Sequence, residues 1–153
     1  MKTTLFVVIL FTLIAMGCSS SKKSNKGMDN DSKSSLTIIT DQSWELIKFG
    51  GAEIDQSNTS DQKIHFILNS ANNRVSGYSG CNVFSGSYTL EEGKRIRFAQ
   101  MVSTKKACME MPIDETDFLR VFTKVDNYTS DGSTLSLNVG RMAPLAVFKV
   151  SSE

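Results

Sequence analysis

The sequence has little of what catalytic and metal sites need. It holds one histidine and three cysteines, and no pair of cysteines has the Cys-x-x-Cys spacing. A zinc site and a thiol redox site are therefore poorly supported. No Gly-x-Ser-x-Gly or Gly-x-Gly-x-x-Gly segment occurs, which removes the usual signatures of a serine hydrolase and a dinucleotide site. We predict no enzyme activity, no metal and no cofactor, and we expect His65 to face solvent from a strand.

The chain also lacks an excess of charge of either sign. It carries 17 Lys and Arg against 16 Asp and Glu, for a formal net charge of +1. Affinity for nucleic acid depends on Lys and Arg that neutralise phosphates. The balance, with no basic cluster among aromatic residues in 36–153, argues against nucleic acid as a partner.

A long apolar run is missing too. The longest one, Leu5–Ala15, covers 11 residues, whereas a membrane-spanning helix takes about 20. Lys2 precedes this run and small residues follow it, which is typical of a secretory signal. Gly17-Cys18 resembles a bacterial lipobox, with Ala15 in place of the more common leucine. We predict a lipoprotein signal peptide over 1–17 and lipid attachment at Cys18; an ordinary signal peptide is the alternative.

The region after Cys18 is polar and has no apolar periodicity. Residues 18–35 are predicted to form a flexible tether, and 36–153 one domain with a core of its own. Ser19-Ser20, rather than aspartate, follows the cysteine, and the stretch is basic. We therefore predict an outer-membrane lipoprotein, anchored by its lipid and facing the periplasm.

The domain alternates apolar and polar residues over several short stretches, as half-buried strands do. Only one stretch has helical periodicity: after Pro112, apolar residues recur at Phe118, Val121, Phe122 and Val125. This predicts a helix over 113–125, with acidic residues in its first turns. Short connections favour antiparallel pairing. The predicted fold class is α+β, a strongly curved antiparallel sheet or open barrel with one helix packed against it. The strands are expected within 43–49, 63–68, 74–80, 83–90, 95–99, 131–139 and 141–150.

Two cysteines remain once Cys18 is lipidated. Cys81 and Cys108 stand 27 positions apart, and export to an oxidising compartment favours a disulfide between them. Such a bond would contribute about 3–4 kcal/mol on the chain-entropy model. Two buried free thiols are the alternative.

The segments "GYSGCNVFSGSY", "IRF" and "STKKACM" resemble the META domain, also called the HslJ-like domain, over residues 43–150. Where the family often has Thr-x-Met-Ala-Cys, this chain has Lys106 in place of the methionine, so that position is expected to be more exposed or packed differently. The residues that carry the resemblance are Trp44, Gly80, Cys81, Asn82, Gly86, Tyr88, Ser103, Thr104, Ala107 and Cys108.

The resemblance implies a bacterial envelope protein linked to stress responses, with no agreed biochemical activity and no catalytic residues. We predict a non-catalytic cell-envelope binding or stress-related module. Its partners would be the membrane, through the lipid anchor, and an envelope protein, a lipid or a small apolar ligand. The alternative is an inhibitor or accessory subunit of an exported hydrolase.

Overall fold

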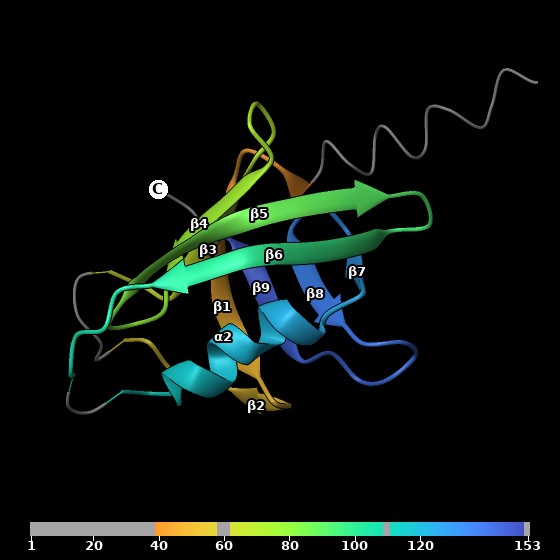
Figure 1. Cartoon of the computed structure of the whole chain (residues 1–153). Coiled ribbons are helices and arrows are strands. Elements are labelled where there is room, and N and C mark those ends of the chain that lie inside the picture. Colours follow the sequence, from red (N-terminus) through yellow and green to blue (C-terminus); the bar gives the residue numbers. More distant parts are fainter. Residues whose placement is uncertain (1–38, 58–61, 109–110, 152–153) are drawn as a thin grey trace, which may run out of the picture.

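The computed structural model describes residues 39–57, 62–108 and 111–151 (Figure 1). The predicted signal peptide, the tether and Cys18 lie outside these ranges. The described strands are β1 Ser43–Phe49, β2 Ala52–Glu53, β3 His65–Asn69, β4 Arg74–Tyr78, β5 Val83–Glu91, β6 Arg95–Ser103, β7 Asn127–Ser130, β8 Thr134–Asn138 and β9 Ala146–Val150. The described helix is α2, Glu115–Lys124.

All strand pairs are antiparallel, and the sheet closes on itself. The order runs from β1 through β3, β4, β5, β6, β7 and β8 to β9, which pairs again with β1. Trp44 lies opposite Val150 in this closing pair, and the short β2 pairs with the far end of β1. The prediction of a strongly curved antiparallel sheet or open barrel with one helix against it is confirmed in its strand pairing and its helix, and the sheet closes into a barrel of eight strands.

One join in the barrel is much weaker than the others. β5 and β6 pair along their full length, but β6 pairs with β7 only at Arg95 opposite Asn127. Within the described residues, no strand pairs with 97–103 on the side away from β5. The helix α2 lies along this side of the barrel, below β6 in Figure 1.

Aromatic rings join the helix to the barrel. The predicted stripe of Phe118, Val121, Phe122 and Val125 is buried, as expected. The Phe122 ring lies 5.0 Å from that of Phe98 on β6, with edge-to-face geometry. Such pairs are favourable beyond the area they bury, and the rings fix the inner face of α2 on the core.

The ends of α2 follow from its sequence. The Asp114 side chain accepts a hydrogen bond from the backbone N–H of Asp117, 2.9 Å away, and so caps the first turn. The helix is therefore shorter at each end than the predicted 113–125.

β7 follows directly and was not predicted, because "NYTS" is polar and only Tyr128 within it is buried. No helix among the described residues is long and apolar enough to cross a membrane.

Candidate functional site

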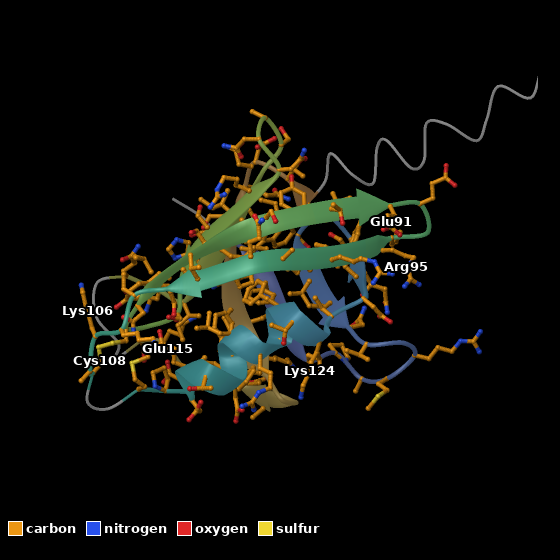
Figure 2. The ribbon with its side chains drawn as sticks, in the orientation of Figure 1. Glu91, Arg95, Lys106, Cys108, Glu115 and Lys124 are labelled. Carbon is orange, nitrogen blue, oxygen red and sulfur yellow. A yellow bond between two sulfur atoms is a disulfide. The ribbon has the colours of Figure 1, made fainter. Side chains whose placement is uncertain are left out.

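A polar cluster around a buried asparagine joins three segments at one end of the barrel. These are the turn between β4 and β5, the chain that leaves β6, and the first turn of α2. Figure 2 shows Lys106, Cys108 and Glu115 gathered at this end. We call the cluster the Asn82 hub; its members are Ser79, Asn82, Thr104, Lys106 and Glu115.

The amide of Asn82 is 1% exposed and is fully engaged. Its Oδ1 accepts hydrogen bonds from Thr104 Oγ1 and from the backbone N–H of Lys106, both at 2.7 Å. Its Nδ2 donates to Glu115 Oε2 at 2.7 Å and to the Lys106 carbonyl at 3.3 Å. Two donors and two accepting positions are the whole capacity of this side chain. Asn82 therefore connects the segments and keeps no hydrogen-bonding group for a ligand.

Ser79 and Glu115 complete the hub. The Ser79 hydroxyl donates to Glu115 Oε1 and also lies 2.7 Å from the Asn82 carbonyl oxygen. The backbone N–H of Ser79 also donates to the Asn82 carbonyl, at 2.9 Å, which closes the turn. Both carboxylate oxygens of Glu115 thus accept a hydrogen bond from the turn, and the beginning of α2 is fixed to the barrel.

The predicted disulfide is present beside the hub. Cys81 and Cys108 are bonded, with their Cα atoms 5.9 Å apart, within the usual range for a disulfide. Cys81 is buried, whereas Cys108 is exposed. The bond ties the turn after β4 to the segment before α2, as the Asn82 amide does. Lys106 is exposed, and its backbone N–H donates a hydrogen bond to the hub.

Two glycines of the motif occupy positions where a larger residue would be strained or would clash. Gly80 has a φ of 101°, a conformation that other residues rarely adopt. At Gly86, a Cβ atom would lie 2.9 Å from the Ala99 carbonyl oxygen and closer still to Met101 Sδ. Gly86 therefore permits the close approach of β5 and β6.

Two further motif residues, Trp44 and Tyr88, lie in the barrel wall, away from the hydrogen bonds of the hub. Trp44 on β1 is buried, and its Nε1 donates to the Ile39 carbonyl at 2.9 Å. Tyr88 on β5 donates from its hydroxyl to the Asn69 carbonyl at 3.2 Å, and burial raises the pKa of its phenol. These interactions explain the presence of Trp44 and Tyr88, because each side chain stabilises the barrel.

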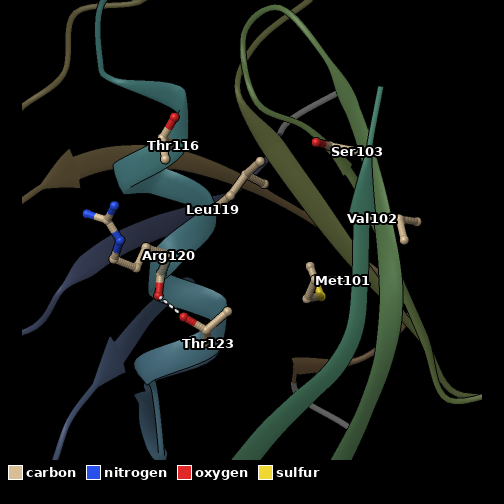
Figure 3. Close-up of a pocket in the computed structure, with 7 residues that line it drawn as sticks. All are labelled: Met101, Val102, Ser103, Thr116, Leu119, Arg120 and Thr123. Carbon is tan, nitrogen blue, oxygen red and sulfur yellow. Dashed lines mark hydrogen bonds between the residues drawn. The ribbon is translucent and has the colours of Figure 1, made fainter. Parts of the chain in front are cut away.

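A groove lies between α2 and β6, next to the hub (Figure 3). It has a volume of about 360 Å³, which is within the size range of ligand pockets. Met101 and Ser103 point from β6 toward the helix, and Leu119 points from α2 toward β6. The lining residues of this α2–β6 groove are Met101, Val102, Ser103, Thr116, Leu119, Arg120 and Thr123.

The groove has apolar walls and polar ends. Val102 beside it is 61% exposed, one of the large hydrophobic side chains that the fold leaves in solvent. Arg120 forms an ion pair with Asp117 on the same helix. Lys105 and Lys106 are exposed just beyond β6, and no described carboxylate is within ion-pair distance of either. The basic side chains thus border an apolar surface.

Other predicted positions bring no chemistry together. His65 is half-buried rather than fully solvent-facing, and its Nδ1 lies 2.8 Å from the Lys63 carbonyl oxygen. In the described part of the chain, no group of three or more His, Cys, Asp or Glu residues could hold a metal ion.

Sequence reasoning missed three features. Glu115 was expected only to favour the helix dipole, yet it is a hub residue. Gln56 stands between two of the predicted strands and was given no role, yet it is 5% exposed and its side chain forms hydrogen bonds with the backbones of Leu46 and Ile64. The groove has no sequence signal, because its walls come from two elements whose packing the sequence does not display.

Comparisons with known proteins identify the fold and the family. The sequence model of the family described as "META domain" matches residues 36–152. An NMR structure of a protein from Burkholderia xenovorans is 23% identical, with a TM-score of 0.61, and covers 78% of this chain and 88% of its own. A crystal structure of a DUF4847 family protein from Bacteroides vulgatus is 13% identical, with a TM-score of 0.50, and covers 75% and 96%. No curated protein matches. At these identities the structures share the fold with this chain.

Proposed function

Because the chain belongs to the META-domain family, we propose that it is a non-catalytic binding module of the bacterial cell envelope, and that its ligand enters the α2–β6 groove. The observation that carries this proposal is the groove itself. It is a hollow of about 360 Å³ beside the part of β6 that pairs with no described strand on the side away from β5. Ligand sites commonly combine apolar walls with a few polar groups that orient the ligand.

The residues that line the groove indicate which chemical class of ligand it would accept. Met101 and Leu119 offer apolar contact, and Thr116 and Thr123 offer hydroxyl groups. An exposed apolar patch on a soluble domain is a common mark of an interaction site. An apolar segment of an envelope protein, a lipid chain or a small apolar ligand would each fit this description.

The hub supports a structural rather than catalytic reading of the motif. Each polar atom of the Asn82 side chain is already hydrogen-bonded inside the protein. A catalytic group needs a free donor, acceptor or proton within reach of the substrate. The family and the structural neighbours give no sign of catalysis.

The cellular setting belongs to the same proposal. Cleavage before Cys18 and lipid attachment there would place the domain on the periplasmic face of the outer membrane, at the end of the tether 18–35. Several acyl chains would anchor it firmly, since one chain alone binds only marginally. In this setting the domain would meet envelope proteins and lipids, and a role in envelope stress would follow from what it binds. The alternative function, inhibition of an exported hydrolase, stays a prediction, and no described loop residue favours it.

Methionine methyl groups allow a direct test on the full lipidated chain in lipid nanodiscs. Met101 lines the groove, whereas Met142, between β8 and β9, is 70% exposed and serves as the control. With ¹³C-methyl methionine, octanoate and indole as small apolar probes should shift the Met101 signal and leave that of Met142 unchanged. Leu119→Gln should weaken this shift, and Met142→Gln should not. If neither these probes nor any peptide moves the Met101 signal, the proposed function is wrong.

A further inference from the structure

We propose that the α2–β6 groove binds an extended peptide segment of another envelope protein, which adds as a strand to the free edge of β6. This inference rests on the proposed function, and it commits to one class of ligand. Strand addition uses the main chain for affinity and alternate side chains for specificity. Strand addition requires a strand on the receiving protein whose backbone N–H and C=O groups point into the site and are not paired with another strand.

The hydrogen-bond pattern shows which β6 residues meet that requirement. The Thr104 N–H donates to the Val83 carbonyl on the β5 side, at 3.1 Å. Backbone groups alternate in direction along an antiparallel strand. Ser103, opposite Phe84, therefore directs its N–H and C=O away from β5, toward the side on which α2 lies. By the same alternation, Met101 does so as well.

The other half of β6 gives the same result. The Ile96 N–H donates to the Asp126 carbonyl at 3.2 Å, on the side away from β5. Phe98, two residues further, therefore presents its backbone on this side, where β7 no longer pairs. In the described part of the chain, no backbone hydrogen bond links α2 to residues 97–103. The free edge thus extends from the last contact with β7 to the groove.

A bulge shapes this edge. Gln100 has a φ of 53°, and the pairing register of β5 and β6 shifts between Ser85 and Ser87. A bulge places an extra residue in one strand and re-aims the side chains around it. Because Gly86 lets Met101 approach so closely, the bulge is held by packing. The edge is formed before any ligand arrives, which lowers the entropy cost of binding.

The helix forms a wall and leaves the edge unpaired. The Thr123 hydroxyl donates to the Arg120 carbonyl at 2.8 Å (Figure 3). The Arg120 guanidinium is engaged with Asp117, and Leu119 has no hydrogen-bonding group in its side chain. A guest strand would lie between these side chains and the backbone of Met101–Ser103. One of its faces would contact Leu119 and Met101.

Charge specifies the guest further. Lys105 and Lys106 follow the free edge, are exposed, and have no described carboxylate within ion-pair distance. A guest with carboxylates at the end beside Ser103 would complement them. The ligand class is therefore an extended segment of about seven residues, matching 97–103, with alternate apolar side chains and an acidic end.

The test again uses the full lipidated chain in nanodiscs, with the Met101 methyl signal as the readout. The probes are synthetic peptides of alternating Val and Thr that end in Asp-Glu, made with the acidic pair at either terminus. One matched set carries N-methyl groups on alternate amides, and another carries Asn-Gln in place of Asp-Glu. We expect at least one acidic orientation to shift Met101 and not Met142. N-methylation should weaken binding about tenfold or more, because it removes backbone hydrogen bonds, and the neutral ending should weaken it less.

Two variants test the edge itself. Ser103→Pro removes an N–H that points to the guest and leaves the Thr104 bond to β5 in place, so it should weaken peptide binding about tenfold. Ser103→Ala keeps the N–H and should weaken peptide binding much less than Ser103→Pro does. Thermal unfolding reports whether Ser103→Pro folds; if it does not, the N-methylated peptides on the unchanged protein decide the question.

The outcomes separate the two proposals. Equal binding of N-methylated and unmodified peptides overturns strand addition and leaves a binding groove. Shifts with octanoate or indole, and none with any peptide, have the same meaning. A Met101 signal that depends on protein concentration alone would assign the groove to a second copy of the chain and overturn the inference. Failure of every probe overturns both proposals.

Discussion

The first turn of α2 and its middle turns meet the barrel in different ways. At the first turn, Glu115 accepts hydrogen bonds from Ser79 and Asn82, and the disulfide lies beside them. In the middle turns, Leu119 faces β6 across an open groove. Polar contacts with fixed geometry thus hold one end of the helix, and this leaves a stretch of β6 free to serve another purpose.

The difference also separates residues that identify the family from residues that could bind. Gly80, Cys81, Asn82, Thr104 and Cys108 lie at the hub, where their interactions stay within the protein. The groove is lined by residues that, apart from Ser103, lie outside the motif. Members that share this fold can therefore differ in what they bind.

The disulfide variant should produce the largest loss of stability. Cys81→Ser combined with Cys108→Ser removes a cross-link over 27 residues, and should lower the free energy of unfolding by about 3–4 kcal/mol. Urea unfolding of the variant and the oxidised protein measures the difference. A loss below about 1 kcal/mol would mean that the hub alone holds this end of α2.

Asn82→Ala removes the central side chain of the hub while the disulfide stays intact. It leaves the Glu115 carboxylate, the Thr104 hydroxyl and the Lys106 backbone without their partner. Unsatisfied half-buried groups of this kind should cost about 2–3 kcal/mol. Chemical denaturation gives the value, and Asn127→Ala, a half-buried asparagine outside the hub, is the matched control. Equal losses of unfolding free energy in the two variants would show that the hub stabilises the fold no more than another half-buried asparagine does.

Gly86→Ala acts on the groove side. The added methyl group would meet Met101 and the Ala99 carbonyl, and should cost about 1–2 kcal/mol through displacement of the bulge. It should also shift the Met101 methyl signal without any ligand. An unchanged signal would show that the bulge does not depend on this close approach.

The smallest effect is expected at the far end of α2. The backbone N–H of Gly140, followed by the Asn127 side chain, holds the pKa of Asp126 below its usual value. Since its folded pKa is lowered, the stability from this carboxylate is present above the unfolded pKa and is lost as the pH falls through the folded pKa. Below about pH 4, Asp126→Asn should therefore lose less stability than the unchanged protein. Unfolding midpoints across the acid range measure this, and parallel pH curves would contradict it.

Local patterns predicted the parts of the fold that depend on neighbours in sequence. The stripe from Phe118 to Val125 predicted the helix, because a helix buries residues at this spacing wherever it packs. The closing pair of β1 and β9 depends on contacts across the whole domain, and no local pattern displays it. The groove and the role of Glu115 also depend on contacts between residues distant in sequence, so no local pattern predicted them. The partners of Glu115 stand more than 30 positions earlier. The family resemblance identified Asn82 and Thr104 but gave no reason for them.

The pairing of β1 with β9 has a consequence for how the chain folds. β1 includes Trp44 and β9 ends at Val150, and the two strands lie side by side. A chain that crosses a membrane from its beginning onward presents β1 long before β9. Contacts between residues so distant in sequence are slow to form. Until the last strand arrives, one edge of β1 remains open to other chains. The interval between the appearance of the first and last strands is thus the period in which a chaperone would matter most to this fold.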